Sequence, residues 1–143
     1  MLFDLDNAVV QLCAAGMQVD GEPEKALALF EQAWEARRDD FDASIAAHFV
    51  ARHQATPRAT LEWNEIALRH AERLTDGRAA ALMPSLCLNL AESYRLAGDV
   101  SQAEQLAERG LVALDQLPVV DGYSAFVRAG LHRLIQRVRD PGG

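Results

Sequence analysis

The stretch from residue 86 to residue 111, LCLNLAESYRLAGDVSQAEQLAERGL, predicts two helices joined by a tight turn. Gly98 interrupts the helical pattern, because glycine is common where a helix ends. Asp99 and Gln102 resemble a capping box, in which two side chains satisfy free backbone N–H groups at the start of the next helix. The stretch therefore predicts an antiparallel helix pair.

The same arrangement occurs twice more along the chain. The second helices of the three pairs align as GEPEKALALFEQAW (21–34), ATPRATLEWNEIAL (55–68) and GDVSQAEQLAERGL (98–111). Pro23 matches Pro57 at a spacing of 34 residues, and Ala103 matches Thr60 at a spacing of 43. Each stretch follows a helix of matching phase. A single helix pair cannot bury both of its faces, so the repeat predicts pairs that stack on their neighbours. Small residues such as Ala26 and Ala33 are expected to allow close contact between helices, and Trp34 and Trp63 are expected to fill the space between pairs.

A period of 34 residues with two helices per repeat resembles the tetratricopeptide repeat family. The third repeat carries most of the pattern, at Leu90, Ala91, Tyr94, Gly98, Ala103 and Gly110. The second repeat departs most, with His48 at a small position, Ala55 in place of the turn glycine and Thr60 in place of alanine. The longer spacing before the third repeat resembles the extended subtype found in kinesin light chains and in bacterial peptide-sensing regulators.

We expect an all-α fold of seven helices, built as an α-α superhelix of three antiparallel pairs and a C-terminal capping helix. The predicted single domain spans residues 1–143, with repeats at 5–38, 41–75 and 78–117 and the capping helix at 121–139. The first helix is expected to start at Asp4 or Asp6, and the third to span Phe41 to Gln54. Thr56 followed by Pro57 is a start signal for the fourth helix, an N-cap with proline just inside the helix. Gly77 suits a left-handed turn at the end of that helix.

The composition limits the classes of partner. A net charge of −7 and a pI near 5.0 argue against general affinity for nucleic acid or for an anionic membrane, because both require clustered basic residues. Cys13 and Cys87 are flanked by apolar residues and are expected to be buried and reduced. No apolar run reaches the length of a membrane span. These features predict a cytoplasmic protein.

The resemblance implies that the first helix of each pair lines a concave groove that binds a partner. The residues placed in this groove are Gln11, Gln18, Ile45, Phe49, Arg52, His53, Leu88, Glu92 and Arg95. Its apolar floor beside Arg52 and Arg95 favours a peptide or helix with apolar anchors and some acidic character. The last helix has an apolar stripe at Val127, Leu131, Leu134 and Val138, and its outer face carries Arg128, Arg133, Arg137 and Arg139. These arginines either form a solvated set that complements the helix dipole or dock an acidic partner.

No catalytic residues, metal ligands or cofactor can be assigned from the sequence. The four histidines are scattered, and no phosphate-binding loop or nucleophile motif is present. The sequence therefore predicts a non-enzymatic module that binds a protein or peptide, without direct contact to nucleic acid or membrane. Two alternatives stay open: a scaffold that forms homodimers or larger assemblies, and the peptide-sensing part of a transcriptional regulatory system.

Overall fold

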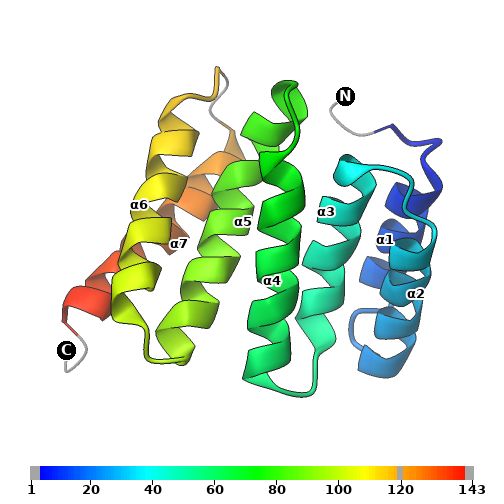
Figure 1. The fold of residues 1–143 in the computed structure, drawn as a ribbon, viewed down its shortest axis with the longest axis horizontal. Helices are drawn as coiled ribbons and strands as arrows, with labels where there is room; N and C mark the ends of the chain where they lie inside the picture. The colour runs from blue at the N-terminus through cyan, green and yellow to red at the C-terminus, as the bar shows by residue number, and fades with distance from the viewer. Residues whose placement is uncertain (1–3, 119–120, 141–143) are drawn as a thin grey trace. The chain divides into compact units, whose positions relative to one another are not determined.

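A computed structural model describes residues 4–118 and 121–140 of the chain (Figure 1). These residues form seven α-helices and one short 3₁₀ helix, and no strand occurs among them. The elements are α1 (Ala8–Gln18), α2 (Pro23–Glu35), α3 (Asp40–Val50), η1 (Ala51–His53), α4 (Pro57–Glu72), α5 (Gly77–Leu96), α6 (Val100–Asp115) and α7 (Gly122–Arg139). The prediction of an all-α chain of helix pairs followed by a C-terminal helix is confirmed.

Two helices begin at the capping residues that the sequence predicts, and a third begins at its predicted limit. The Oγ1 atom of Thr56 accepts a hydrogen bond from the backbone N–H of Ala59 at 3.1 Å, and Pro57 occupies the first position of α4. Asp99 accepts in the same way from Gln102 at 3.1 Å. Asp121 caps α7. Each cap satisfies a backbone donor that has no partner within the helix.

The first helix begins later than predicted. Asn7, rather than Asp4 or Asp6, caps α1, because its side-chain oxygen accepts from the backbone N–H groups of Val9 at 2.8 Å and Val10 at 3.3 Å.

The predicted ends of two further helices were also wrong. The third helix does not continue to Gln54: α3 ends at Val50, and the chain tightens into η1 over the next three residues. Gly77 does not form a left-handed turn but is the first residue of α5. Among the described residues only Gly98 has a positive φ, of 86°.

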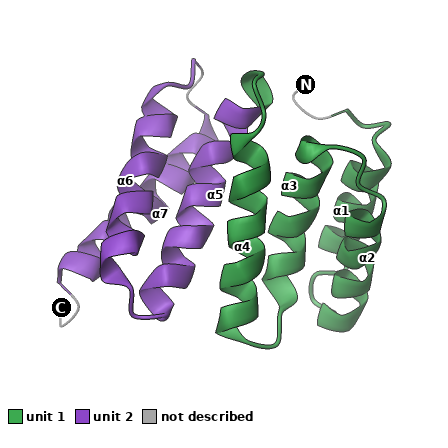
Figure 2. Cartoon of the chain, viewed as in Figure 1, with its two compact units in different colours: residues 1–78 green, residues 79–143 purple. Residues whose placement is uncertain are grey.

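The chain divides into two compact units, unit 1 (residues 1–78) and unit 2 (residues 79–143), which Figure 2 colours separately. The boundary falls near the start of α5. In unit 1, α1 packs on α2, α3 packs on α4, and α3 also contacts both helices of the first pair. The aromatic ring of Phe30 is fully buried in this unit, and Ala26 and Ala33 are also buried on α2. The predicted close contact of small residues is confirmed here.

In unit 2, α7 packs on α6 around an aliphatic cluster. The buried members of this cluster are Ala91, Ala103, Ala107, Leu114, Val127, Leu131, Leu134 and Ile135. Gly110 allows Leu131 to approach closely, since a Cβ atom at Gly110 would lie 2.9 Å from a methyl carbon of Leu131. The apolar stripe predicted for the last helix therefore covers the preceding pair. The prediction of a single domain across both units stays a prediction.

Candidate interaction surfaces

The predicted groove residues of unit 1 differ in their exposure. Gln11 and Gln18 are exposed on α1, whereas Ile45 on α3 is only 7% exposed. Phe49 is partly buried and stacks on the ring of Phe30, with 5.2 Å between the ring centroids. The aromatic part of the predicted floor is therefore anchored in the core of unit 1, and only part of its surface can contact a partner.

Arg52 and His53 share one carboxylate. The guanidinium of Arg52 donates to Asp20 at 2.7 Å, and the His53 Nε2 atom lies 2.7 Å from the other oxygen of Asp20. Hydrogen bonds from Arg52 and His53 lower the pKa of Asp20 to about 2. Asp20 follows α1, so this contact ties the turn between α1 and α2 to η1. Both predicted groove residues have a structural partner in unit 1.

The predicted groove residues of unit 2 are also partly engaged. Leu88 packs against α7, where a Cβ atom at Gly130 would lie 3.1 Å from a methyl carbon of Leu88. The guanidinium of Arg95 contacts the carboxylate of Glu92 at 2.6 Å, one turn away on α5. Each unit thus contributes a paired arginine beside apolar residues. A groove that extends across both units stays a prediction.

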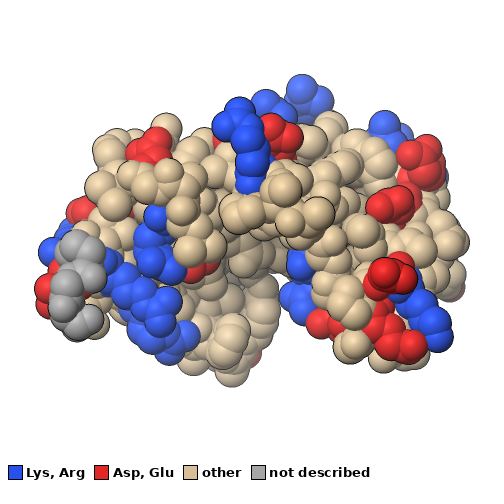
Figure 3. All heavy atoms as spheres, turned by 90° about the horizontal axis from the view of Figure 1, so that it is seen from below, with Lys and Arg blue, Asp and Glu red and all other residues tan. Residues whose placement is uncertain are grey.

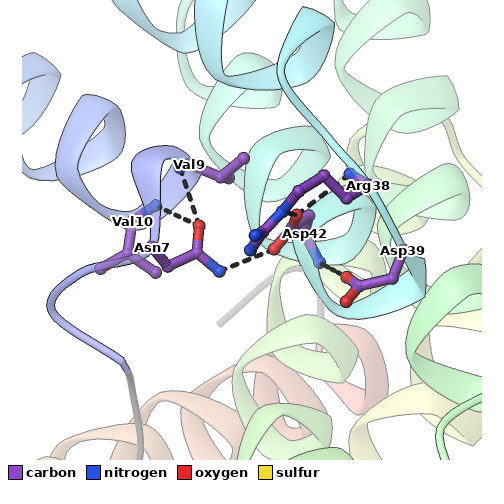
Figure 4. Close-up of polar contacts among 6 residues, drawn as sticks. All are labelled: Asn7, Val9, Val10, Arg38, Asp39 and Asp42. Carbon is purple, nitrogen blue, oxygen red and sulfur yellow. Dashed lines mark hydrogen bonds and ion pairs between the residues drawn. The ribbon is translucent and has the colours of Figure 1, made fainter.

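A buried carboxylate network holds the start of α1 against the start of α3 (Figure 4). Asp42 is fully buried, and its Oδ1 atom accepts from the side-chain amide of Asn7 at 2.8 Å. Its Oδ2 atom accepts from the backbone N–H and the Nε atom of Arg38, both at 3.0 Å. Burial raises the pKa of Asp42, but the hydrogen bonds from Asn7 and Arg38 outweigh this effect and lower it.

The sequence did not reveal this network. The Asp39-Asp40-Asp42 cluster predicts capping and dipole interactions, which Asp39 confirms by accepting from the backbone N–H of Asp42 at 2.8 Å. Asp40 instead contacts His70 at 2.8 Å, from α4. Helical phase alone does not show that Asn7, from a separate helix, reaches the buried carboxylate of Asp42.

The arginines of α7 are not equivalent. Arg128 pairs with Asp115 at 2.9 Å, and Arg139 contacts Glu104 at 2.8 Å and Glu108 at 3.0 Å. Figure 3 shows basic side chains gathered towards the C-terminal end of the chain. Phe126 on the same helix is 68% exposed. Because their carboxylate partners lie on α6, Arg128 and Arg139 link α7 to α6. These contacts add a structural role to the predicted solvated face.

An open hollow in unit 1 lies outside the predicted groove. It has a volume of about 860 Å³ and is lined by Ala28, Glu31, Gln32, Trp34, Glu35, Ala36, Val50, Gln54 and Trp63. Most of these residues belong to α2, the second helix of its pair. The two tryptophans were predicted to pack between helix pairs, and their edge-to-face contact, with 5.0 Å between the ring centroids, confirms this. The accessible space beside them was not predicted.

Comparison with known proteins adds no family or relative. No protein-family model matches the chain, and no curated protein or solved structure matches it significantly. Within the described residues, no group of three or more His, Cys, Asp or Glu side chains is placed to hold a metal ion. None of the described helices is long and apolar enough to cross a membrane.

Proposed function

We propose that the chain is a tetratricopeptide-like, non-catalytic module that binds a protein or peptide partner. The observation that carries this proposal is the recurrence of buried small residues where the helices of each pair meet. Ala33, Ala67 and Gly110 occupy the same position in the three second helices, and all three are buried. We infer that the accessible side chains of the first helices, few of which remain on α3, form the recognition surface.

The chemistry of the predicted groove favours a partner segment with apolar and acidic side chains. Arg52 and Arg95 supply guanidinium groups that can bind carboxylates in a bidentate manner. Each already contacts an internal carboxylate, Asp20 or Glu92. An acidic partner would therefore compete with an exposed or half-buried internal pair, which costs little because such pairs contribute only about 0–1 kcal/mol.

A charge swap tests the groove without breaking its ion pair. Glu92→Arg combined with Arg95→Glu keeps two opposite charges one turn apart on α5 but reverses their positions. The matched control swaps the exposed pair on α4, Arg58→Glu with Glu62→Arg. We expect affinity capture from the native cell extract to lose a partner with the groove swap and to keep it with the control. The dissociation constant of that partner should then be measured with each purified variant.

If both swaps retain the same partners with equal affinity, the groove is not the binding site. Circular dichroism of both variants should match that of the wild type, because neither swap alters a buried residue or the net charge. A loss of helix in the groove swap alone would mean that the pair is structural.

A second candidate function is self-assembly through unit 2. Phe126 on α7 is 68% exposed, and Val112 on α6 is 57% exposed. Exposed apolar side chains at the end of a helical repeat favour contact with a second copy. Sedimentation over a range of concentrations tests this alternative: a species that stays monomeric at high micromolar concentration excludes a stable dimer.

A further inference from the structure

The hollow beside Trp34 and Trp63 combines aromatic surface with uncompensated negative charge. Glu31 and Glu35 lie one helical turn apart on α2, and both are exposed. Neither carboxylate forms an ion pair or hydrogen bond with another described residue. Among the residues that the structure describes, no basic side chain lines the hollow. This arrangement differs from the predicted groove, where each arginine faces an internal carboxylate.

The aromatic wall is suited to a cation. Trp34 and Trp63 meet edge to face, with an angle of 87° between their planes. The guanidinium of Arg37 already lies over the ring of Trp34, 3.9 Å from the centroid. Arginine and lysine are attracted to the face of an indole ring. Because Arg37 covers one face of Trp34, an incoming cation would use the parts of Trp34 and Trp63 that line the hollow.

Arg37 does not supply a cation to the hollow itself. Its Nη1 atom donates to the backbone oxygen of Trp34 at 2.7 Å, which holds the side chain beside its own helix. Arg37 is not among the residues that line the space. No described basic side chain lines the hollow with Glu31 and Glu35, so a cation bound there would be supplied by a partner.

We propose that the hollow binds an arginine or lysine side chain from a basic segment of a partner protein. The inference rests on the proposed function, and it adds a second surface with a partner of opposite charge. The cationic head would lie between the two carboxylates, while the alkyl stem would pack on the indoles and Ala28. The volume of about 860 Å³ lies within the range of roughly 300–1,000 Å³ that is common for ligand clefts. A neighbouring apolar residue of the partner can enter with the basic one.

Unit 1 as a whole supports a basic partner. It contains fourteen acidic and eight basic side chains, whereas unit 2 contains seven and six. The resulting field attracts positive segments before contact and raises their association rate. The hollow then supplies the specific contacts.

The protein provides its own readout for this proposal. Its two tryptophans are Trp34 and Trp63, and both line the hollow. Tryptophan emission on excitation near 295 nm therefore reports binding at this surface. The probe is an acetylated and amidated nonapeptide, AARLARLAA, titrated into the full chain. The matched probe carries citrulline, a neutral analogue of arginine, at both arginine positions.

We expect the arginine peptide to change the emission in a saturable way and to bind about tenfold more tightly than the citrulline peptide, since each tenfold change in affinity corresponds to about 1.4 kcal/mol. Glu31→Gln with Glu35→Gln should weaken binding of the arginine peptide by a similar factor. The matched control, Glu24→Gln with Glu62→Gln, removes the same charge from α2 and α4 outside the hollow and should leave the affinity within about twofold.

A blocking variant provides an independent test. Gln32→Arg places a guanidinium on an exposed position of α2 within the hollow, where it can occupy the space between the carboxylates. Arginine is a good helix former, so we expect the variant to fold and to lose peptide binding. Retention of wild-type affinity by this variant would overturn the proposal.

Three other results would overturn it. If both double Glu→Gln variants weaken binding of the arginine peptide equally, the peptide is held by general charge attraction. Equal affinity for N-acetylarginine amide would identify a small-cation site rather than a protein-docking site. Self-association of the wild type that the Glu31→Gln, Glu35→Gln variant abolishes would identify a second copy of the chain as the occupant.

The outcome is separable from that of the proposed groove. The Glu92→Arg, Arg95→Glu swap lies in unit 2 and should leave binding of the arginine peptide unchanged. If the peptide does not bind while the groove swap loses its captured partner, only the inference about the hollow fails. If the peptide binds and the groove swap does not change partner binding, the proposed groove is rejected and the proposal for the hollow stands.

Discussion

The two compact units are stabilised by different kinds of side chain. Four buried polar residues, Asn7, Asp42, Ser44 and Asn64, lie in unit 1, while Ser93 is the buried polar residue described in unit 2. Unit 1 also contains the buried ring of Phe30 and its stacked neighbour Phe49. Unit 2 instead surrounds α7 with aliphatic side chains, and its ion pairs lie at the surface.

This difference shows two ways to fix a helix at the end of a repeat. In unit 2, the continuous apolar stripe of α7 provides non-directional burial along the helix. In unit 1, α1 has only 11 residues and buries Val9, Cys13 and Gly16. Its position is further fixed by the directional contact between Asn7 and Asp42. A short helix therefore depends more strongly on a few polar contacts, and the following substitutions test that conclusion.

The largest effect is expected from Asp42→Ala. It removes three hydrogen bonds to a fully buried carboxylate and leaves the amide of Asn7 without its acceptor. Hydrogen bonds to charged groups contribute about 1.5–3 kcal/mol, so we expect the free energy of unfolding to fall by about 3 kcal/mol. The measurement is urea unfolding followed by tryptophan emission, which reports unit 1.

The comparison in unit 2 is Asp121→Ala, which removes an exposed N-cap of α7. The loss of a cap costs about 1 kcal/mol. Equal losses from the two substitutions would contradict the special role of the buried network in unit 1.

Glycine contacts provide the next comparison. A Cβ atom at Gly16 in α1 would lie 2.3 Å from the ring of Phe30, whose side chain is fully buried. A Cβ atom at Gly110 in α6 would lie 2.9 Å from a terminal methyl carbon of Leu131. Overpacking costs about 1–3 kcal/mol, partly offset by the helix propensity of alanine. We expect Gly16→Ala to destabilise the protein by about 2 kcal/mol and Gly110→Ala by less.

Urea unfolding followed by circular dichroism measures both glycine variants. The ring of Phe30 is rigid, whereas the end of Leu131 can rotate to another rotamer. A larger loss for Gly110→Ala would show that the aliphatic cluster of unit 2 is the less adaptable core.

His48 gives unit 1 a response to pH. Burial, with a smaller effect from the charge of Arg52, lowers the pKa of His48 to about 4. The pKa of histidine in an unfolded chain is about 6.5. Between these values the unfolded chain binds a proton that the folded chain does not, so this contribution to stability is present above about pH 6.5 and is lost as the pH falls towards 4.

Through His48, the free energy of unfolding of the wild type should fall by about 1–2 kcal/mol between pH 7 and pH 5. Partial burial of the imidazole keeps this loss modest. His48→Gln should flatten the stability profile over this interval, measured by urea unfolding at each pH. Asp20 does not contribute there, since its pKa of about 2 places its effect below pH 4. The same slope in the wild type and the variant would exclude His48 as its source.

The sequence predicted features that depend on local periodicity and capping. Thr56, Asp99 and Asp121 begin helices as expected, because each cap requires only neighbouring backbone groups. The stripe at Val127, Leu131 and Leu134 was likewise visible from helical spacing and is buried.

Features that join distant segments were not predictable in the same way. Asn7 and Asp42 are 35 positions apart, and their contact requires the relative placement of α1 and α3. The hollow depends on the space left beside Trp34 and Trp63, which the identities of the residues do not specify. For the predicted groove, the sequence indicated helix phase but not the internal carboxylates that engage Arg52, His53 and Arg95.

The smallest predicted effect concerns two glycines that the sequence assigned to turns. Gly98 has a φ of 86°, a left-handed conformation that costs a residue with a Cβ atom about 1 kcal/mol. Gly77 begins α5 without a positive φ, and a Cβ atom there would meet nothing within 4 Å. We expect Gly98→Ala to destabilise the protein by about 1 kcal/mol and Gly77→Ala to be neutral or to stabilise it by up to about 1 kcal/mol, because alanine restricts the unfolded chain. Thermal unfolding followed by circular dichroism distinguishes the two signs, and a loss of stability in Gly77→Ala as large as that in Gly98→Ala would contradict the different backbone roles of these glycines.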